Sequence, residues 1–337
     1  MKSKILPSYN KERTELGKIL PLDTPFTVII DSSEICNFKC NYCFRSNEDG
    51  PDATYAKQEG LMKWNTFIKI VDQLKEFPNE VKRISLSGHG EPLCNKLLPD
   101  MISYIKKSGL AGKVEIHTNG SLLVDDKFRN RLADSGLDRI IISLQGLNAY
   151  SYKEISDISI DFDRFYNSIK DFYICAKNTN VNIKIADIAL SEYERNKFYQ
   201  MFSDIGDRVY IEKIVPLFKD VDYSNIIVSD KKINKYGSHF GEQRCCNQVF
   251  YTLFITPEGN IYPCAELDPP LRLGNVNKKT LVEAWNCKVR KGFLKKNLIS
   301  GYKSHPKCKD CYIPYNNVKV KKDIIDHYSK EILVRLQ

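Results

Sequence analysis

Three closely spaced cysteines are the residues of this chain best suited to metal chemistry. Cys36, Cys40 and Cys43 follow an apolar run with the spacing C-x3-C-x2-C. Structural zinc takes four ligands, and the spacing points neither to Cys94 nor to a histidine as the fourth. Three thiolates on one short loop suit three irons of a four-iron cluster. The spacing therefore predicts an iron–sulfur cluster whose fourth iron is open to an exogenous ligand.

A second group of cysteines follows residue 244, and two kinds of metal site are compatible with it. Its members are Cys245, Cys246, Cys264, Cys308 and Cys311. The closing C-x2-C pair is typical of a zinc ribbon as well as of an iron–sulfur site. Because adjacent residues of a strand point to opposite faces, only one of Cys245 and Cys246 should reach a metal. Cys94 and Cys175 stand alone and Cys287 lies in a predicted helix, so we interpret these three as structural.

The composition is that of a globular protein without a membrane span. Of the 337 residues, 42% are hydrophobic and 28% are charged, which suits one large α/β domain with a smaller second one. No apolar run approaches the ~18 residues of a membrane span, and the N-terminus lacks the apolar core of a signal peptide. We therefore predict a cytoplasmic location, where clustered cysteines hold metal more often than they form disulfides.

The net charge of +9 is concentrated at the C-terminal end. Residues 278–337 carry 15 Lys and Arg against 5 Asp and Glu, whereas the other residues carry 36 against 37. This stretch is either a solvated basic face or a docking surface for an anionic partner: an acidic electron donor such as flavodoxin or ferredoxin, a nucleotide diphosphate or a lipid headgroup. Nucleic acid is disfavoured, because the basic residues are not interleaved with stacking aromatics.

Apolar runs alternate with helical patterns over the first two thirds of the chain. The predicted strands are 26–31, 83–88, 114–118, 139–144, 181–188 and 208–215. The predicted helices between them are 61–77, 97–109, 125–136, 161–177 and 192–206. This alternation implies a parallel sheet with right-handed crossovers, and six units predict an α/β fold with a partial (β/α)6 TIM-like barrel. Functional side chains of such folds lie at the C-terminal ends of the strands.

The last third of the chain has a different pattern. Residues 249–264 predict a β-hairpin, 281–296 a helix and 323–336 a core-facing helix. We therefore divide the chain into an N-terminal extension (1–25), the barrel (26–220), a connector (221–243), a small domain of hairpin plus helix (244–315) and a C-terminal helix (316–337).

The first cysteine group and the strand ends resemble the radical S-adenosylmethionine (SAM) superfamily. Tyr42 supplies the aromatic of a C-x3-C-x-aromatic-C motif, and SGHGEP at 87–92 is similar to the family's GGEP motif, with His89 as a departure. HTNG at 117–120 and SLQG at 143–146 are similar to later family segments. The resemblance implies that the three cysteines hold a [4Fe–4S] cluster whose open iron binds SAM. It also implies SAM-binding roles for Tyr42, Ser87, Gly88, His89, Gly90, Glu91, Asn119 and Ser143, and weaker ones for Ile185 and Leu217, which core packing explains equally well.

The second cysteine group resembles the SPASM/twitch extension of this superfamily, which carries auxiliary [4Fe–4S] clusters. No cysteine follows Cys311, so the chain is similar to the shorter twitch version with one auxiliary cluster. The resemblance implies Cys246, Cys264, Cys308 and Cys311 as its four ligands, with Cys245 as the alternative to Cys246. Four protein thiolates would leave no iron open, so this cluster should transfer electrons. The two-part layout is similar to that of the 2-deoxy-scyllo-inosamine dehydrogenases.

The resemblance implies a radical reaction. In this superfamily a 5′-deoxyadenosyl radical made from SAM abstracts hydrogen from an unactivated C–H bond, while the protein orients the substrate and excludes water. We expect oxidation of a small polar substrate: a sugar, cyclitol or nucleotide sugar. The alternatives are a peptide-modifying enzyme, disfavoured because only some 25 residues precede the first strand, and a zinc-binding scaffold. Candidates for proton transfer are His117, Asp187 and Lys213, with Glu212 as the alternative to Lys213 because strand alternation turns only one of the two inward.

Overall fold

The predicted β/α alternation forms in the computed structural model, which describes residues 3–7, 9, 11–47, 49, 53–188, 190–218, 221–224, 226 and 233–337. The six predicted strands correspond to β1 (Thr27–Ile30), β2 (Arg83–Ser85), β3 (Val114–Thr118), β4 (Arg139–Leu144), β5 (Asn180–Asp187) and β6 (Arg208–Lys213). Each pairs in parallel with the next, in the order of the chain. The α/β prediction is therefore confirmed, and all six strands end at the same edge of the curved sheet.

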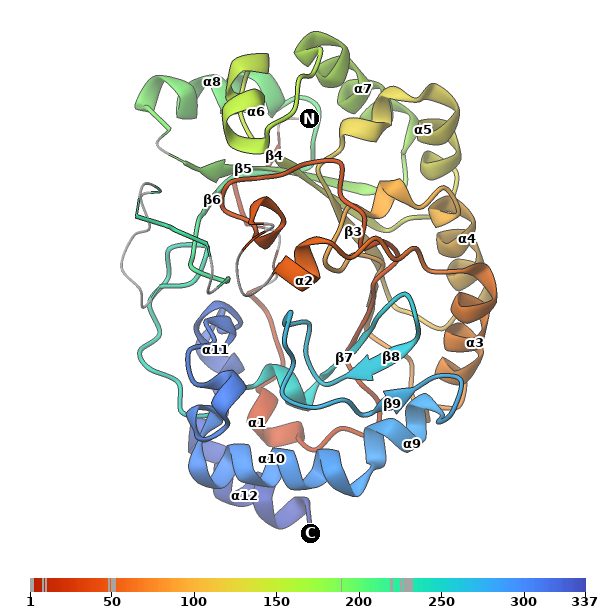
Figure 1. Cartoon of the computed structure of the whole chain (residues 1–337), viewed down its shortest axis with the longest axis vertical. Coiled ribbons are helices and arrows are strands. Elements are labelled where there is room, and N and C mark those ends of the chain that lie inside the picture. The colour runs from red at the N-terminus through yellow and green to blue at the C-terminus, as the bar shows by residue number, and fades with distance from the viewer. Residues whose placement is uncertain are drawn as a thin grey trace.

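Helices cover the outer face of this sheet (Figure 1). They are α3 (Trp64–Leu74), α4 (Leu98–Ser108), α5 (Asp126–Ala133), α6 (Ala149–Ser156), α7 (Phe162–Cys175) and α8 (Glu192–Phe202). Local signals fix several ends: Ser191 and Glu194 form a capping box on α8, and α4 stops at Gly109, whose φ of 67° is left-handed. Helix α6 was not predicted from the sequence. It begins at Asn148, whose side chain accepts a hydrogen bond from the Ser151 N–H.

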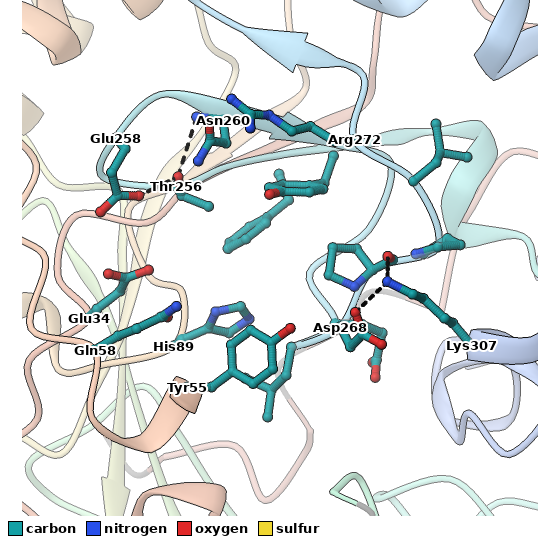
Figure 2. A pocket seen from close by; sticks show the side chains of 17 residues that line it. Glu34, Tyr55, Gln58, His89, Thr256, Glu258, Asn260, Asp268, Arg272 and Lys307 are labelled. Carbon is teal, nitrogen blue, oxygen red and sulfur yellow. Dashed lines mark hydrogen bonds and ion pairs between the residues drawn. The ribbon is translucent and has the colours of Figure 1, made fainter. Parts of the chain in front are cut away.

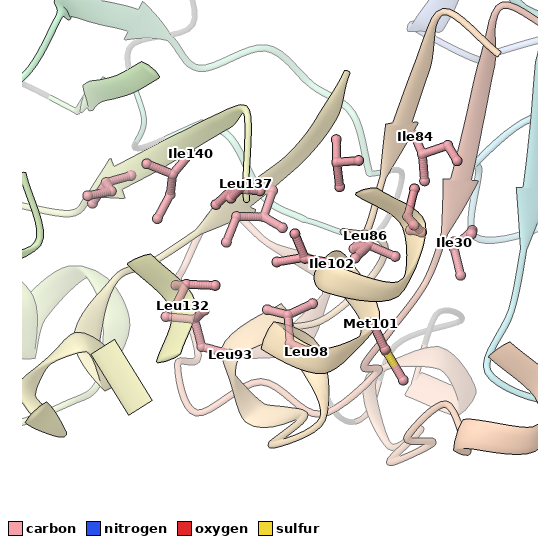
Figure 3. Packing of buried hydrophobic residues seen from close by; sticks show 14 of the residues in the cluster. Ile30, Ile84, Leu86, Leu93, Leu98, Met101, Ile102, Leu132, Leu137 and Ile140 are labelled. Carbon is pink, nitrogen blue, oxygen red and sulfur yellow. The ribbon is translucent and has the colours of Figure 1, made fainter. Parts of the chain in front are cut away.

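The main core lies between the sheet and these helices. Ile84 of β2 and Ile140 of β4 are fully buried with Leu98 and Ile102 of α4 in one apolar cluster (Figure 3). Alternation along β4 places Ile140, Ile142 and Leu144 in this cluster. Ser143 therefore points to the opposite face, which is the inside of the barrel.

The C-terminal part extends the same sheet. The predicted hairpin forms from β7 (Thr252–Ile255) and β8 (Asn260–Tyr262), followed by β9 (Gly274–Asn275). Strand β7 pairs in parallel with β1, so the described residues form one nine-stranded sheet in the order β6-β5-β4-β3-β2-β1-β7-β8-β9. The cysteine-rich end of the chain is thereby attached directly to the strand that precedes the first cysteine group.

The predicted helix at 281–296 is wrong in detail, because it is two helices. They are α9 (Leu281–Asn286) and α10 (Lys288–Ser300), which meet at Cys287. Cys287 has an extended backbone (φ −66°, ψ 149°), and its thiol accepts a hydrogen bond from the Arg290 N–H at 3.5 Å. This residue caps α10 and ends α9.

A second, smaller core joins the two ends of the chain. Helix α1 (Leu16–Ile19) packs through Leu16 against Ile332 of α12 (Ser329–Arg335) in a cluster that also contains Leu294 of α10. Helix α12 is shorter than the predicted 323–336, because two 3-10 turns precede it. The remaining short helices are α2 (Ala53–Ala56) and α11 (Ile313–Asn316). Among the residues that the structure describes, no helix is long and apolar enough to cross a membrane.

Candidate functional site

The first cysteine group occupies the loop that follows β1. The Cys43 N–H donates to the Cys40 carbonyl at 2.9 Å, and the N–H groups of Lys39 and Asn41 donate to carbonyls at the end of α6. Burial raises the pKa of the Cys40 thiol to about 12 and also raises the pKa values of Cys36 and Cys43. Thiols that ionise so reluctantly are poor nucleophiles, whereas a bound metal would hold them as thiolates. The loop therefore suits a metal cluster better than covalent catalysis.

This loop borders a cavity of about 400 Å³ at the C-terminal ends of the strands, which we call the reaction cavity. The predicted site residues that line it are Cys36, Tyr42, Cys43, Gly88, His89, Gly90, Ser143 and Leu217. The structure thus brings together segments from the ends of β1, β2, β4 and β6. Tyr42 is further held by a hydrogen bond from its hydroxyl to the Gln145 side chain.

One buried carboxylate, that of Glu91, accepts the hydrogen bonds that hold the segment 87–92 against the end of β3. Glu91 accepts hydrogen bonds from the Asn119 N–H at 2.7 Å, the Leu93 N–H at 3.0 Å and the Thr118 hydroxyl. Burial raises the pKa of Glu91 to about 7, although these donors favour the ionised form. Glu91 therefore ties the end of β3 to the loop after β2 without lining the cavity. Ser87, which also lies behind the cavity, accepts a hydrogen bond from the His117 N–H at 2.6 Å.

Two further predicted SAM contacts, besides Ser87 and Glu91, do not line the cavity. Ile185 is fully buried in the core between the sheet and the helices, so its assignment to adenine packing is wrong. Its neighbours Lys184 and Ala186 line the cavity instead. The Asn119 amide donates to the Asn37 side chain at 2.9 Å, behind the cavity wall. Asn119 therefore supports the cysteine loop without lining the cavity.

Two of the predicted proton-transfer residues, Asp187 of β5 and Lys213 of β6, lie on the faces of their strands that point away from the reaction cavity. Asp187 is paired with Arg195 of α8 at 2.5 Å, and Lys213 does not line the cavity. Glu212, the alternative to Lys213, does line it. His117 lies 3.6 Å from Glu115 through Nε2, and burial together with Lys184 and Lys235 lowers its pKa to about 4. This shift favours the neutral imidazole, and His117 does not line the reaction cavity.

Sequence reasoning missed two cationic residues of the cavity. Lys184 is ion-paired with Glu212, which also lies 2.8 Å from Lys235. The sequence does contain a signal for Lys184, because this residue alternates with the apolar Ile183 and Ile185 along β5. Arg45 is 6% exposed, and its Nε and Nη1 donate to carbonyls of His89, Ala56 and Gln58. Among the residues that the structure describes, its buried Nη2 has no hydrogen-bond partner, so it can donate to a bound anion.

The second cysteine group forms a separate site beside α10. Cys246, Cys264, Cys308 and Cys311 line one cavity. The Cys246 N–H donates to the Asn297 side chain at 3.1 Å, which fixes this residue against α10. The Cys245 thiol instead faces the Asn297 carbonyl at 3.6 Å and does not line the cavity. The geometry therefore favours Cys246 over its neighbour.

The spacing of these side chains suits clusters better than single ions. Within the described ranges, no three side chains of His, Cys, Asp or Glu are close enough together to bind one metal ion. A tetrahedral zinc site would hold its four thiolates around one atom at about 2.3 Å. A four-iron cluster binds each cysteine to a different iron, so its ligands lie farther apart. Among the described residues, neither cysteine group is therefore gathered around a single ion.

The comparisons with known proteins agree with this geometry. The profile of the radical SAM superfamily matches residues 30–182, and the profile of the SPASM iron–sulfur cluster-binding domain matches residues 245–312. A probable GTP 3′,8-cyclase of Methanococcus maripaludis is 40% identical over 121 residues, which are 36% of this chain and 37% of that protein. The alignments with four of the curated relatives span between 28% and 63% of the lengths of those proteins.

Solved structures share the fold over most of the chain. SuiB of Streptococcus suis bound to S-adenosylmethionine has a TM-score of 0.61 at 18% identity, covering 92% of this chain and 78% of its own. BtrN in complex with AdoMet and 2-DOIA has a TM-score of 0.52 at 20% identity, covering 90% and 96%. The two domains imply a SAM-binding [4Fe–4S] cluster and auxiliary iron–sulfur binding. This chain therefore carries a radical SAM domain over residues 30–182 and a C-terminal iron–sulfur domain of the SPASM/twitch type over residues 245–312.

Proposed function

We propose that this enzyme removes two electrons from a small hydroxylated substrate, a sugar, cyclitol or nucleotide sugar. The observation that carries the proposal is that Glu266 and Ile313 line both the reaction cavity and the auxiliary cysteine site. Only a thin wall of side chains therefore separates the two. When bound, the SAM cluster supplies a hydrogen-abstracting 5′-deoxyadenosyl radical and the auxiliary cluster supplies a site for the second electron.

The chain's own residues would position the reactants. Cys36, Cys40 and Cys43 would hold the first cluster, and Cys246, Cys264, Cys308 and Cys311 the auxiliary one. Tyr42, Gly88, Gly90 and Ser143 would line the SAM site. The Nη2 of Arg45, which has no partner within the described part of the chain, offers a donor to the SAM carboxylate or to another anion. The apolar Phe44, Ile214, Leu217 and Phe218 would exclude water from the cavity.

Formation of an oxidised product tests this function. Reduced enzyme, SAM and a pool of candidate sugars and cyclitols are incubated without oxygen, and products are identified by mass spectrometry. We expect substrate-dependent 5′-deoxyadenosine together with a product two hydrogens lighter than its substrate. Substrate-dependent 5′-deoxyadenosine without such a product would contradict the oxidation and favour a redox-neutral reaction.

Oxidation of a carbinol carbon also releases a proton from the hydroxyl, and we assign Lys184 as its acceptor. Burial and the nearby Lys235 lower the pKa of Lys184, whereas Glu212 opposes this shift. A lower pKa increases the neutral, proton-accepting form at a given pH, so the rate of product formation should rise with pH while Lys184 deprotonates.

Replacing Lys184 by methionine should therefore uncouple the reaction. We expect K184M to lose oxidised product by about 10²-fold, in line with the loss of a general base, while 5′-deoxyadenosine still forms. The control is K235M, which removes the other cation on Glu212 but does not line the cavity. Equal losses in both variants would show that Lys184 only neutralises Glu212.

Two further points stay open as proposals. Peptide modification is the second candidate function, because SuiB has also been solved with its precursor peptide SuiA. The same oxidation assay with peptides in the pool separates the two.

An acidic electron donor remains a prediction of the sequence, and Lys288, Lys291 and Lys296 on the exposed side of α10 are placed to receive it. Reduction of the clusters by flavodoxin should then slow with increasing salt.

A further inference from the structure

A second cavity, of about 310 Å³, opens beside the reaction cavity, and we call it the side cavity (Figure 2). His89 and Glu266 line both cavities. The His89 ring is held between them by a 3.1 Å hydrogen bond between Nε2 and the Ala265 carbonyl, and its backbone N–H donates to Asp31 at 2.9 Å. A ligand in the reaction cavity can therefore extend past His89 into the side cavity.

One wall of the side cavity carries aromatic rings. His89 lies 4.9 Å from Phe254 between ring centroids, and Phe254 lies 6.4 Å from Tyr262. This row runs from the SAM-binding segment along the hairpin, and Tyr55 adds a further ring. Such rings bury the C–H faces of a hydroxylated ring well. The side chains of Gln58 and Asn260 lie beside them and can bond to its hydroxyl groups.

The charges of this cavity are unbalanced. Four carboxylates line it, against the cations Arg272 and Lys307, and Lys307 is already paired with Asp268 at 2.5 Å. The uncompensated negative charge lies at Glu34 and Glu258, whose carboxylates both approach Gly60. A Cβ atom on Gly60 would lie 2.4 Å from the Glu34 carboxylate and 2.9 Å from that of Glu258. In the part of the chain that the structure describes, neither carboxylate has a cation within ion-pair distance.

Glu34 is the more deeply buried of these two carboxylates. It is only 4% exposed, and a backbone N–H of Gly60 bonds to its carboxylate. A buried carboxylate without a cation is costly, and a ligand that brings a positive charge between the pair would relieve that cost.

We infer that the side cavity binds a hydroxylated ring bearing a protonated amino group, as the distal part of a substrate that reacts in the reaction cavity. This inference rests on the proposed function, because it assumes a hydroxylated substrate. It narrows the substrate class to amino-sugar-containing compounds. A nucleotide sugar is disfavoured, since its diphosphate would meet the carboxylates of Glu34 and Glu258.

Equilibrium dialysis of the reconstituted full-length protein tests the subsite without turnover. The probes are glucosamine, N-acetylglucosamine, which has the same ring without the charge, and UDP-glucose. We expect glucosamine to bind at least tenfold more tightly than the other two, and the double variant E34Q/E258Q to lose this preference. The control D163N removes a carboxylate from a different surface hollow and should keep it.

The outcomes separate the subsite from the reaction. Equal binding of glucosamine and N-acetylglucosamine, tighter binding of UDP-glucose, or a preference that survives in E34Q/E258Q would each overturn the inference. Because dialysis needs neither reductant nor SAM, a protein that prefers glucosamine but forms no oxidised product would keep the subsite and lose the proposed function.

Discussion

Replacing Cys246 by serine should remove the auxiliary cluster and leave the SAM cluster in place. Cys246 lines one cavity with Cys264, Cys308 and Cys311, and Asn297 holds its backbone on both sides, accepting from its N–H and donating to its carbonyl. Iron content should fall to about half, because each of two four-iron clusters holds half of the iron. The paramagnetic resonance spectrum of the reduced protein should then show one cluster only, while SAM binding persists.

The neighbouring cysteine is the matched control. Cys245 is also buried, but its thiol points to the Asn297 carbonyl and does not line the cavity. We expect C245S to keep both clusters. If C246S keeps its full iron content and C245S loses half, the assignment of the auxiliary ligand is reversed.

The loss of this cluster should also change the reaction. Under the proposed function, C246S should still form 5′-deoxyadenosine but should give no oxidised product, since the second electron has no acceptor. An oxidised product from a C246S protein with one cluster would show that the auxiliary site is dispensable for the oxidation.

The six barrel strands could be predicted because their signals are local. Each is a largely apolar strand of three to eight residues that precedes a glycine, a polar turn or a capped helix. The pairing of β7 with β1 could not be predicted, because it joins residues more than 220 positions apart, such as Thr27 and Thr252. No pattern within either segment specifies its partner. The break at Cys287 was missed because every residue around it is compatible with a helix.

The site residues also divide into those that a local sequence motif predicts and those whose position depends on the fold. Residues carried by contiguous motifs, such as Cys36, Tyr42 and Cys43 of the first group and Gly88 to Gly90, line one cavity as expected, although Cys40 does not line it. Asp187 and Lys213 were misplaced because a strand's periodicity gives two faces but does not say which faces inward. The packing of Ile183 and Ile185 against the outer helices settles that question for β5, and thereby turns Lys184 inward. Arg45 had no signal, since its role depends on contacts with distant loops.

Replacing Gly90 by alanine should disrupt the SAM site. A Cβ atom at Gly90 would lie 2.4 Å from the Ser33 carbonyl oxygen and 2.5 Å from that of Ile35. These are backbone atoms of the segment that connects β1 to Cys36, so they cannot rotate away. The segment must move, and the 2.8 Å hydrogen bond from the Glu91 N–H to the Ile35 carbonyl should break.

We expect G90A to lose about 1–3 kcal/mol of stability, the usual cost of overpacking. Its affinity for SAM should fall by more than tenfold, measured by equilibrium binding to the reconstituted protein. The control is G292A on the exposed side of α10, where the added methyl group would meet no described atom within 4 Å apart from its chain neighbours and the backbone of its own helix. That variant should gain about 0.5–1 kcal/mol, because alanine favours a helix interior.

Comparing G90A with G292A separates a general effect of an added methyl group from the effect of the close backbone contacts at Gly90. A G90A protein with normal iron content and normal SAM affinity would show that the two loops can move apart without cost. The contact between them would then not position Cys36. Reduced SAM affinity with normal iron content would instead place the damage in the Gly88–Gly90 segment itself. Cluster assembly and SAM binding would then depend on different parts of the same loop pair.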